Sequence, residues 1–466
     1  MLDLRARGCV ASGTTGAVAA GAEAAAAIGA RVLREGGNAF DAVIATAMAE
    51  TVALPSKCGL AGDVVALVVT PDHPEPRSLV ALGGAAAGLY DAAAAADWQV
   101  APTGPLSVGI PGAPAGYAAL AARGRLPLDR LTAPAVELAR SGMWWSPMNA
   151  LLESESRTLL ATYQPDGCRY SPRSRPHEVG DTVVLPGLAR ALEEFTERGA
   201  ALFHDGPLAE ALLRTVEGHG GVLTAADLCS AVADERTAPS RPVAEDSPRA
   251  LFVTHLPTYG AALADVLARN APSTVSPETV AASLAALLRG DLGTDEGTST
   301  IAAADDEGNA VVLVHSNSFP QYGSGIVVED YDLVLSNRAG RGFTFTPDHP
   351  NSPVPGRRPL TTLHAWGIRH PNGWLLGATP GGRQQVPWNA QLLGHLLSGP
   401  REFPDDRLAD ALTTARWMLD ADGSVREEGR DVPHLGVRSS HTLVRTSPDG
   451  LTAAADPRWD STAVAV

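Results

Sequence analysis

Residues 297–317 read G-T-S-T-I-A-A-A-D-D-E-G-N-A-V-V-L-V-H-S-N. This stretch predicts two strands, at 299–304 and 311–314, because aliphatic and β-branched residues favour extended chain. The Asp-Asp-Glu-Gly-Asn segment between them is typical of a hairpin turn. Thr298 stands at the start of the first strand and directly follows a loop, residues 290–297, that is rich in glycine and acidic residues. The predicted structure changes here from mainly helical to mainly extended.

The part before this stretch is predicted to contain several helices and two strands. Apolar residues at helical spacing predict a helix over 15–36, which Gly36-Gly37 ends, and a buried helix over 41–53. Strands at 64–70 and 79–82 are expected to pair. Residues 231–249 have no clear period and predict an exposed connection. Further helices are predicted at 115–122, 131–141, 206–217 and 277–289.

The part after the hairpin is predicted to continue in strands and then to return to helices. The five prolines of residues 344–359 predict an ordered loop. Helices before strands before helices, in one chain, indicate a layered α/β domain with helices on each face. The strands are expected at 326–328, 333–335 and 374–378, and the helices at 384–397 and 406–418.

The composition indicates a folded protein, because 45% of its 466 residues are hydrophobic and only 19% are charged. Acidic residues outnumber basic ones by 52 to 36, which gives a net charge of −16. Such a surface repels nucleic acid and anionic lipid, so neither is expected as a partner. Lys57 is the only lysine, which argues against catalysis through a lysine Schiff base.

The pattern of cysteines and histidines gives no sign of a metal site or a disulfide framework. The four cysteines are far apart and the twelve histidines lack metal-ligand spacing, so no metal or cofactor is expected. No apolar run reaches the roughly 18 residues of a membrane span. Glu23 and Arg31 interrupt the alanine-rich N-terminal stretch, unlike a secretory signal, so we expect a cytoplasmic protein.

The sequence has no G-x-S-x-G elbow, P-loop, H-E-x-x-H or G-x-G-x-x-G after a strand. Eight short segments instead resemble, in the same order, the signatures of the γ-glutamyltranspeptidase family of N-terminal-nucleophile hydrolases. This resemblance implies an α/β fold, the four-layer αββα sandwich of those hydrolases. The eight segments are Glu35–Ala42, Gly59–Asp63, Val108–Gly116, Gly220–Asp227, Asp305–Ala310, Gly323–Ile326, Gly356–Thr362 and Pro380–Gly382.

The resemblance places Thr298 at the family's nucleophile position and implies autocatalytic cleavage. The Thr298 hydroxyl would attack the Gly297 carbonyl, and hydrolysis of the ester would leave a large segment, 1–297, and a small segment, 298–466, associated in one αββα domain. The freed α-amine of Thr298, with an unperturbed pKa of about 7.7–8.0, would then act as the base. Because nucleophile and base share one residue, no Ser/His/Asp set is required.

Other positions match the family's oxyanion and substrate sites. Gly381 and Gly382 match the glycines whose N–H groups bind the oxyanion in the family. Either Ser316 or His315 falls where the family has a threonine that contacts the nucleophile. Thr361 and Thr362 replace two serines that bind the substrate carboxylate. The residues expected to bind a small-molecule substrate are Ser316, Asn317, Asn337, Thr361 and Thr362.

Two departures from the family pattern predict an altered specificity. Residues 83–88 stand where γ-glutamyl-binding members carry an arginine, and here they contain only Gly and Ala. Residues 337–342 lack the acidic pair that holds the substrate amine, and Arg338 and Arg341 suggest an anionic or differently oriented substrate. The chain is also short between Leu256-Pro257 and Thr298, which implies a reshaped pocket.

Three alternatives remain beside an acyl hydrolase or transferase of altered specificity. One is a homologue in specialised metabolism that cleaves a C–C or amide bond of a non-glutamyl substrate with the same threonine. Another is a non-catalytic scaffold, although Thr298, Gly381 and Gly382 are all retained. A dehydrogenase-like nucleotide-binding protein is disfavoured because no phosphate loop follows a strand.

Overall fold

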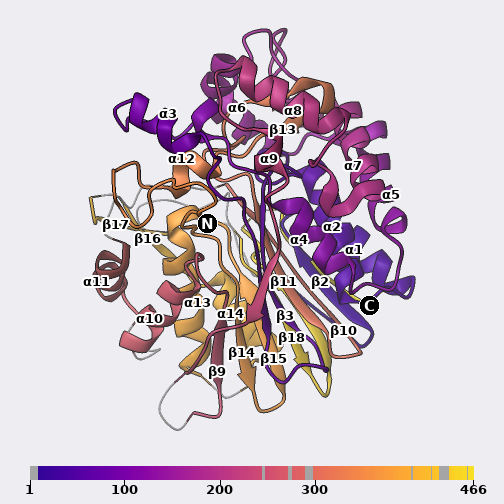
Figure 1. Ribbon diagram of the computed structural model, residues 1–466. Helices are drawn as coiled ribbons and strands as arrows, with labels where there is room; N and C mark the ends of the chain where they lie inside the picture. The colour runs from indigo at the N-terminus through magenta and orange to yellow at the C-terminus, as the bar shows by residue number, and fades with distance from the viewer. Residues whose placement is uncertain are drawn as a thin grey trace.

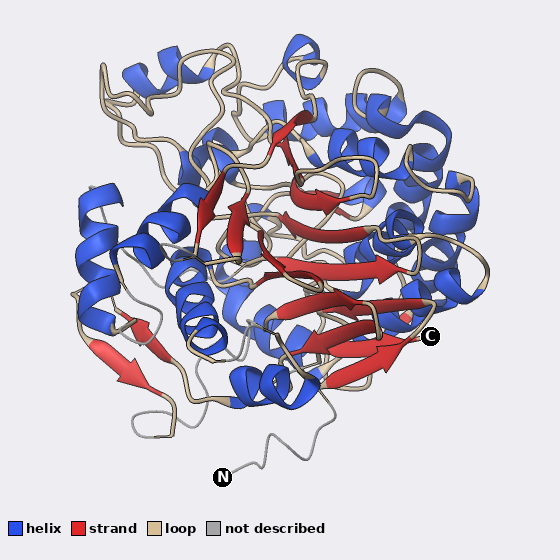
Figure 2. Cartoon of the chain, turned by 90° about the horizontal axis from the view of Figure 1, so that it is seen from below, coloured by secondary structure: helices blue, strands red, loops and turns tan. Residues whose placement is uncertain are grey.

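Two seven-stranded sheets lie face to face, and helices cover the outer face of each (Figure 1). The computed structural model describes residues 9–243, 247–270, 275–288, 297–399, 402–420, 422–429, 440–458 and 460–466. Figure 2 shows the strands stacked between the two groups of helices. This four-layer αββα arrangement confirms the fold class expected from the sequence.

The first sheet combines strands from both ends of the chain and from the predicted hairpin. Its order is β20-β2-β10-β11-β3-β4-β7, and all neighbouring strands are antiparallel. Helices α1 (Glu23–Arg34), α2 (Ala39–Ala53) and α4 (Ala113–Ala121) pack on its outer face. Its strands are β2 (Gly16–Ala20), β3 (Asp63–Val69), β4 (Arg77–Ala81), β7 (Asp234–Thr237), β10 (Ser299–Asp305), β11 (Ala310–Ser316) and β20 (Thr462–Ala465).

The second sheet has the order β1-β19-β18-β15-β14-β9-β8. Helices α10 (Gly260–Arg269), α13 (Gln385–Leu397) and α14 (Asp405–Thr413) pack on its outer face, with α11 (Pro277–Leu288) against α10. Its strands are β1 (Val10–Gly13), β8 (Ser240–Pro242), β9 (Ala250–Val253), β14 (Trp366–His370), β15 (Gly373–Ala378), β18 (Thr442–Ser447) and β19 (Gly450–Ala455).

The remaining elements lie around this sandwich, and α5 and α7 add a second helical layer over α2 and α4. No helix of the described chain is both long and apolar enough to cross a lipid bilayer. These elements are α3 (Leu89–Ala95), α5 (Leu128–Ser141), α6 (Pro147–Tyr163), α7 (Pro186–Arg198), α8 (Pro207–Gly218), α9 (Ala225–Leu228), α12 (Arg338–Gly342), and the short strands β5 (Met143–Trp144), β6 (Thr182–Val183), β12 (Val327–Val328), β13 (Leu333–Val334), β16 (Trp417–Leu419) and β17 (Val425–Glu427).

Strand alternation determines which side chains enter the layer between the two sheets. Ala302 and Ala304 of β10 face the second sheet, whereas Ile301 and Ala303 face the helices. In β11, Val312 and Val314 likewise point between the sheets. Because successive side chains of a strand point to opposite faces, Thr298, Thr300 and Ser316 lie on the inter-sheet side. Ser299 and His315 lie on the helix side.

Most predicted elements are confirmed, including the hairpin of β10 and β11 and the buried helix α2. The single helix predicted over 15–36 is wrong in its first part, because Gly16–Ala20 form β2 between β10 and β20. Alanine has the highest intrinsic helix propensity, but pairing with two neighbouring strands overrides that local preference here. Helix α1 then ends at Arg34, before Gly36-Gly37 as expected.

Two further predictions are wrong in part. The connection predicted at 231–249 is largely exposed but contains two short edge strands, β7 in the first sheet and β8 in the second. The helix predicted over 406–418 ends at Thr413, and Trp417–Leu419 form β16. There the Trp417 backbone bonds to side chains of α13, so tertiary contacts decide the conformation. The predicted loop at 290–297 lies outside the described residues except for Gly297.

The G-G-N-A-F-D-A segment forms the start of α2. Asn38 accepts hydrogen bonds from the N–H groups of Phe40 and Asp41, and Asp41 accepts one from Asn38 N–H, which is a capping box. The buried Asp41 carboxylate also accepts from the backbone of Arg125 and Leu126. This segment therefore has a structural role.

Asp305 connects the hairpin to α2. Its carboxylate accepts hydrogen bonds from the N–H groups of Glu307 and Asn309, from the Asn309 side-chain amide, and from Ala39 N–H at the start of α2, all between 2.8 and 3.1 Å. The carboxylate is buried and stands at the helix N-terminus, where a negative charge is favourable. It therefore ties the turn after β10 to the helical layer.

Replacement of Asp305 by alanine should destabilise the protein, because buried backbone N–H groups would lose their acceptor. We expect Asp305→Ala to lower the free energy of unfolding by about 3 kcal/mol, measured by urea denaturation. The matched control is Asp306→Ala, because Asp306 is the exposed neighbour in the same turn. Equal stability of the two variants would contradict this role for Asp305.

Candidate active site

Thr298 is buried where β10 begins, at one edge of the sandwich. The start of β10, the end of β11 and the start of β3 meet at this edge, since Ser299 pairs with His315 and Ser316 pairs with Asp63. The hydroxyl of Thr298 belongs to the layer between the two sheets. Residues of both sheets can therefore reach it.

The side chain of Ser316 contacts both sides of the Gly297–Thr298 peptide bond. Its Oγ lies 3.1 Å from Thr298 Oγ1 and donates a hydrogen bond of 2.5 Å to the Gly297 carbonyl oxygen. A serine hydroxyl has one proton, so Thr298 is the donor in the first contact. Ser318 N–H also donates to Ser316 Oγ, at 2.8 Å. Of the two candidates left open by the sequence, it is Ser316 and not His315 that contacts Thr298.

The backbone is crowded around Gly297. A Cβ atom at this position would lie only 2.2 Å from the carbonyl oxygen of Ser318. Ser318 itself has a φ of 71°, which is uncommon for a residue with a side chain. Ser318 was not identified from the sequence, because its contribution comes from its backbone.

Thr442 of the second sheet lies at the same edge of the sandwich and contacts β10. Ala378, at the end of β15, pairs with Thr442, and Thr442 Oγ1 donates a hydrogen bond of 2.9 Å to Thr300 Oγ1. The turn that follows β15 therefore begins beside the first residues of β10. This turn contains Gly381 and Gly382, with φ values of 130° and 52°, which side-chain-bearing residues rarely adopt.

Thr361 and Thr362 lie beside this turn. Thr362 Oγ1 accepts a hydrogen bond of 3.4 Å from Gln385, the first residue of α13. Thr361 is buried, and its N–H donates to the Pro257 carbonyl oxygen. The structure thus gathers both threonines and both glycines on the second-sheet side of the edge.

Asn317 and Asn337 lie against each other, because Asn337 N–H donates to the Asn317 carbonyl oxygen. The Asn337 amide donates to the carbonyl oxygens of Pro102 and Phe319, and the Asn317 amide donates to Pro55. These contacts hold surrounding loops in place. The Oδ1 atoms of both side chains are buried without a protein partner, so substrate contacts by these residues stay a prediction.

Buried polar residues also lie on the helix side of β10 and β11. His315 Nε2 is 2.7 Å from Glu50 Oε2, and its Nδ1 is 2.8 Å from the Tyr117 hydroxyl. Possible ligand atoms of Glu50, Cys58 and His315 lie within 4.8 Å of one another. The direct hydrogen bond between Glu50 and His315 leaves no space for an ion between those two groups.

Arg338 forms a buried ion pair with Asp63 in the site. Its Nε donates to Asp63 Oδ2 at 2.6 Å, and the two side chains are 6% and 1% exposed. Burial raises the pKa of the Asp63 carboxyl, and the Arg338 charge opposes part of this shift. The positive charge of Arg338 is therefore already balanced within the protein, which weakens the sequence-based argument that it signals an anionic substrate.

The segment that replaces the family's arginine is tightly packed. Ala85 exchanges backbone hydrogen bonds with Gly356 and Arg357, and its side chain is buried near Ala339 and Phe343. A Cβ at Gly83 would lie 2.0 Å from the carbonyl oxygen of Ile110. The space for a long basic side chain is thus occupied.

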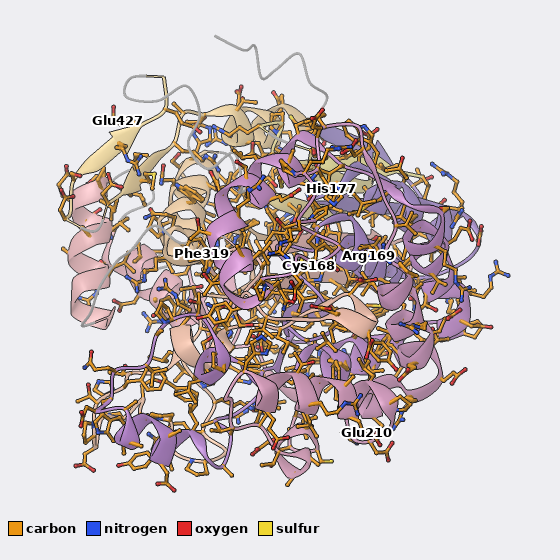
Figure 3. The ribbon with its side chains drawn as sticks, turned by 90° about the horizontal axis from the view of Figure 1, so that it is seen from above. Cys168, Arg169, His177, Glu210, Phe319 and Glu427 are labelled. Carbon is orange, nitrogen blue, oxygen red and sulfur yellow. The ribbon has the colours of Figure 1, made fainter. Side chains whose placement is uncertain are left out.

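Arg341, the second arginine of residues 337–342, stacks over the ring of Phe319 with 5.6 Å between its guanidinium carbon and the ring centre. Figure 3 shows Phe319 in the body of the protein, while Glu210 and Glu427 lie at its periphery. This cation–π contact gives Arg341 a partner within the protein.

Three of the four cysteines are poor candidates for the nucleophile. Burial raises the pKa of the thiols of Cys9 and Cys58, and that of Cys168 to about 11, so these thiols stay protonated at neutral pH. Cys168, Arg169 and His177 (Figure 3) line a surface hollow of about 650 Å³. None of the residues lining it is a predicted site residue.

The comparison with known families agrees with this geometry. The family model described as Gamma-glutamyltranspeptidase matches residues 25–269 and 257–466, which is nearly the whole chain. The chain belongs to the γ-glutamyltranspeptidase family. As a member, it is an enzyme of the hydrolase and transferase type that this family represents. The resemblance seen in the eight short segments is confirmed.

Two curated relatives match along most of their length. Glutathione hydrolase proenzyme of Escherichia coli is 24% identical, and the match covers 92% of this chain and 87% of the length of that protein. Oxamate amidohydrolase proenzyme of Klebsiella pneumoniae is 25% identical over 86% of this chain and 85% of its own. The solved structure of cephalosporin acylase from Bacillus halodurans covers 99% of this chain and 97% of its own, with a TM-score of 0.84 and 24% identity.

Removal of Arg338 should destabilise this γ-glutamyltranspeptidase-family member, because Asp63 would keep a buried charge without its partner. We expect Arg338→Met to cost about 3–5 kcal/mol of unfolding free energy. The loss should be smaller at acidic than at alkaline pH, since the pKa of Asp63 is raised and protonation removes the unpaired charge. Urea denaturation at several pH values measures both effects.

The double variant Asp63→Asn/Arg338→Met is the control for that experiment. It removes both charges, so most of the lost stability should return. A stable single variant with no pH dependence would show that the ion pair contributes little to the site.

Proposed function

We propose that this enzyme cuts its own chain between Gly297 and Thr298 and then uses Thr298 to hydrolyse or transfer an acyl group. The observation that carries the proposal is the position of Ser316, with Oγ 3.1 Å from Thr298 Oγ1 and 2.5 Å from the Gly297 carbonyl oxygen. One hydroxyl thus contacts both the attacking oxygen and the carbonyl that it would attack.

The hydrogen bonds suggest a path for self-cleavage. Thr298 Oγ1 attacks the Gly297 carbonyl carbon while its proton moves toward Ser316 Oγ, and the Ser316 proton stabilises the developing oxyanion. The C–N bond breaks, the Thr298 nitrogen takes a proton, and an ester joins Gly297 to Thr298 Oγ1. Water then hydrolyses the ester and leaves a Gly297 carboxylate and a free Thr298 hydroxyl.

In the mature enzyme, the freed α-amine of Thr298 acts as the general base for its own hydroxyl. Thr298 attacks the acyl carbon of a small-molecule substrate, and the N–H groups of Gly381 and Gly382 stabilise the oxyanion. Thr361 and Thr362 contact the substrate from the second-sheet side, and Asn317 and Asn337 do so from the first. The acyl-enzyme is then resolved by water or by an acceptor.

The two segments would stay associated after cleavage. In the first sheet, β10 and β11 of the small segment pair with β2 and β3 of the large segment. In the second sheet, β14 pairs with β9, and β19 with β1. Segments 1–297 and 298–466 therefore share both sheets of a single αββα domain, and separating them would break both sheets.

The relatives support amide-bond hydrolysis but suggest different substrates. Those that match along most of their length are named as hydrolases of glutathione and of oxamate. In this chain Ala85 stands where the glutamate-binding arginine is expected, residues 337–342 hold no acidic pair for the substrate amine, and Arg338 is paired with Asp63. A zwitterionic γ-glutamyl group would therefore lack both of its charged partners, so a non-glutamyl acyl group is the better candidate.

Self-cleavage should convert the chain into two fragments, residues 1–297 and 298–466, of about 31 and 17 kDa in proportion to the full mass of 48.1 kDa. Thr298→Ala should remain a single chain because it lacks the attacking hydroxyl. Thr298→Ser keeps a hydroxyl and should still be cut, though more slowly. A denaturing gel with intact-mass measurement distinguishes these results.

The cleavage should also be intramolecular, with a first-order rate that does not depend on protein concentration. A wild-type protein that is active but uncut, or a Thr298→Ala variant that is cut at Gly297, would rule out this proposal.

Glutathione and γ-glutamyl-p-nitroanilide should be poor substrates. Two lost charge-assisted contacts, each worth about 1.5–3 kcal/mol, predict a kcat/KM at least about 100-fold lower than that of the E. coli relative. Side-by-side assays of both proteins measure the ratio, with oxamate as the comparison substrate. Comparable turnover of glutathione would show that another residue binds its carboxylate, and Arg341 would be the first to test.

A further inference from the structure

Three polar side chains form a buried cluster on the helix side of the nucleophile strands. Glu50 comes from α2, Tyr117 from α4 and His315 from β11, and each is 0% exposed. Helix α2 is otherwise largely apolar and buried. Burial of a carboxylate and an imidazole costs several kcal/mol unless hydrogen bonds compensate, so packing alone does not account for this group.

The cluster is a continuous chain of hydrogen bonds. Burial raises the pKa of Tyr117 far above its usual value, so the phenol keeps its proton and can donate to His315 Nδ1 at 2.8 Å. The opposite ring nitrogen, Nε2, then donates to Glu50 Oε2 at 2.7 Å. Glu50 Oε1 accepts a further bond of 2.7 Å from Gly21 N–H. Both nitrogens of His315 are thus used, which fixes the orientation of its ring.

This chain of bonds holds the strands that carry the site. His315 pairs with Ser299 across β10 and β11 and directly precedes Ser316. Since successive residues point to opposite faces, anchoring His315 among the helices directs Ser316 toward Thr298. Gly21, which follows β2, lies so close that a Cβ there would be 2.6 Å from Ser299 Oγ and 3.2 Å from Glu50 Oε1. Ends of three adjacent strands therefore converge on Glu50.

We propose that Glu50, His315 and Tyr117 are positioning residues that set the register of β10 against β11 and thereby place Ser316 on the Gly297–Thr298 peptide bond. The inference rests on the proposed self-cleavage, which supplies a rate that needs no known substrate. Displacement of reacting groups by about 1 Å can slow a reaction about 100-fold. Loosening the cluster should therefore slow cleavage strongly even where the free energy of unfolding changes little.

The test compares cleavage rates of full-length variants made by cell-free synthesis. Tyr117→Phe removes only the hydroxyl at the end of the cluster and should slow cleavage at least about tenfold. Its matched control is Tyr170→Phe. Tyr170 is also a buried tyrosine, but its hydroxyl donates to the backbone oxygen of Asp332 and not to the cluster. The control should be cut within about twofold of the wild-type rate.

Substitution of Glu50 separates positioning from packing. Glu50→Gln keeps one acceptor for His315, whereas Glu50→Leu has a similar volume and no acceptor. A positioning role predicts that Glu50→Gln retains more of the cleavage rate than Glu50→Leu, even where the two variants have the same urea midpoint. A packing role predicts rates that follow stability alone.

The wild type and Thr298→Ala are run in the same series. If the wild type is not cut, the proposed function itself fails. If the wild type is cut and both Tyr117→Phe and Glu50→Leu are cut at its rate, only the positioning role is overturned. If Glu50→Leu does not fold, the comparison of Tyr117→Phe with Tyr170→Phe decides the question.

Discussion

The register of β10 against β11 puts the Ser316 hydroxyl beside the peptide bond between Gly297 and Thr298, and the proposed chemistry depends on that register. A shift of one residue would turn every side chain of β10 to the opposite face. Thr298 would then point toward the helices, and Ser316 would lose contact with it. Two polar groups join the hairpin to α2 and so hold the register: Asp305 at the turn, and the cluster around His315 near the other end.

The two ends of the hairpin have different functions. At the turn, the carboxylate of Asp305 joins the strands to the start of α2, so this signature segment stabilises the fold. At the opposite end, Thr298 and Ser316 lie between the sheets. Thr442 of the second sheet donates a hydrogen bond to Thr300 there. The site is therefore built from both sheets, and it requires the layered architecture as a whole.

The sequence predicted much of this fold because many of its elements have a strong local signal. The hairpin has aliphatic and β-branched strands on either side of a turn segment, and α2 is a long apolar run that begins with a capping box; both were found. The segment of β2 predicted a helix because alanine has a high helix propensity, whereas its strand partners, β10 and β20, are distant in the sequence. In the proposed site, motif spacing predicted Thr298, Gly381 and Gly382 as catalytic residues. It could not choose between Ser316 and His315, since that choice depends on which face each side chain occupies, nor find Ser318, which acts through its backbone.

Trapping of the ester intermediate tests the central claim most directly, namely that Thr298 Oγ1 attacks the Gly297 carbonyl. Hydroxylamine added to freshly synthesised chain should intercept the ester and accelerate cleavage. The account predicts a large fragment that ends in a Gly297 hydroxamate and a small fragment that begins at Thr298, with neither formed by Thr298→Ala. Cleavage that hydroxylamine does not accelerate, and that leaves only a carboxylate at Gly297, would contradict it.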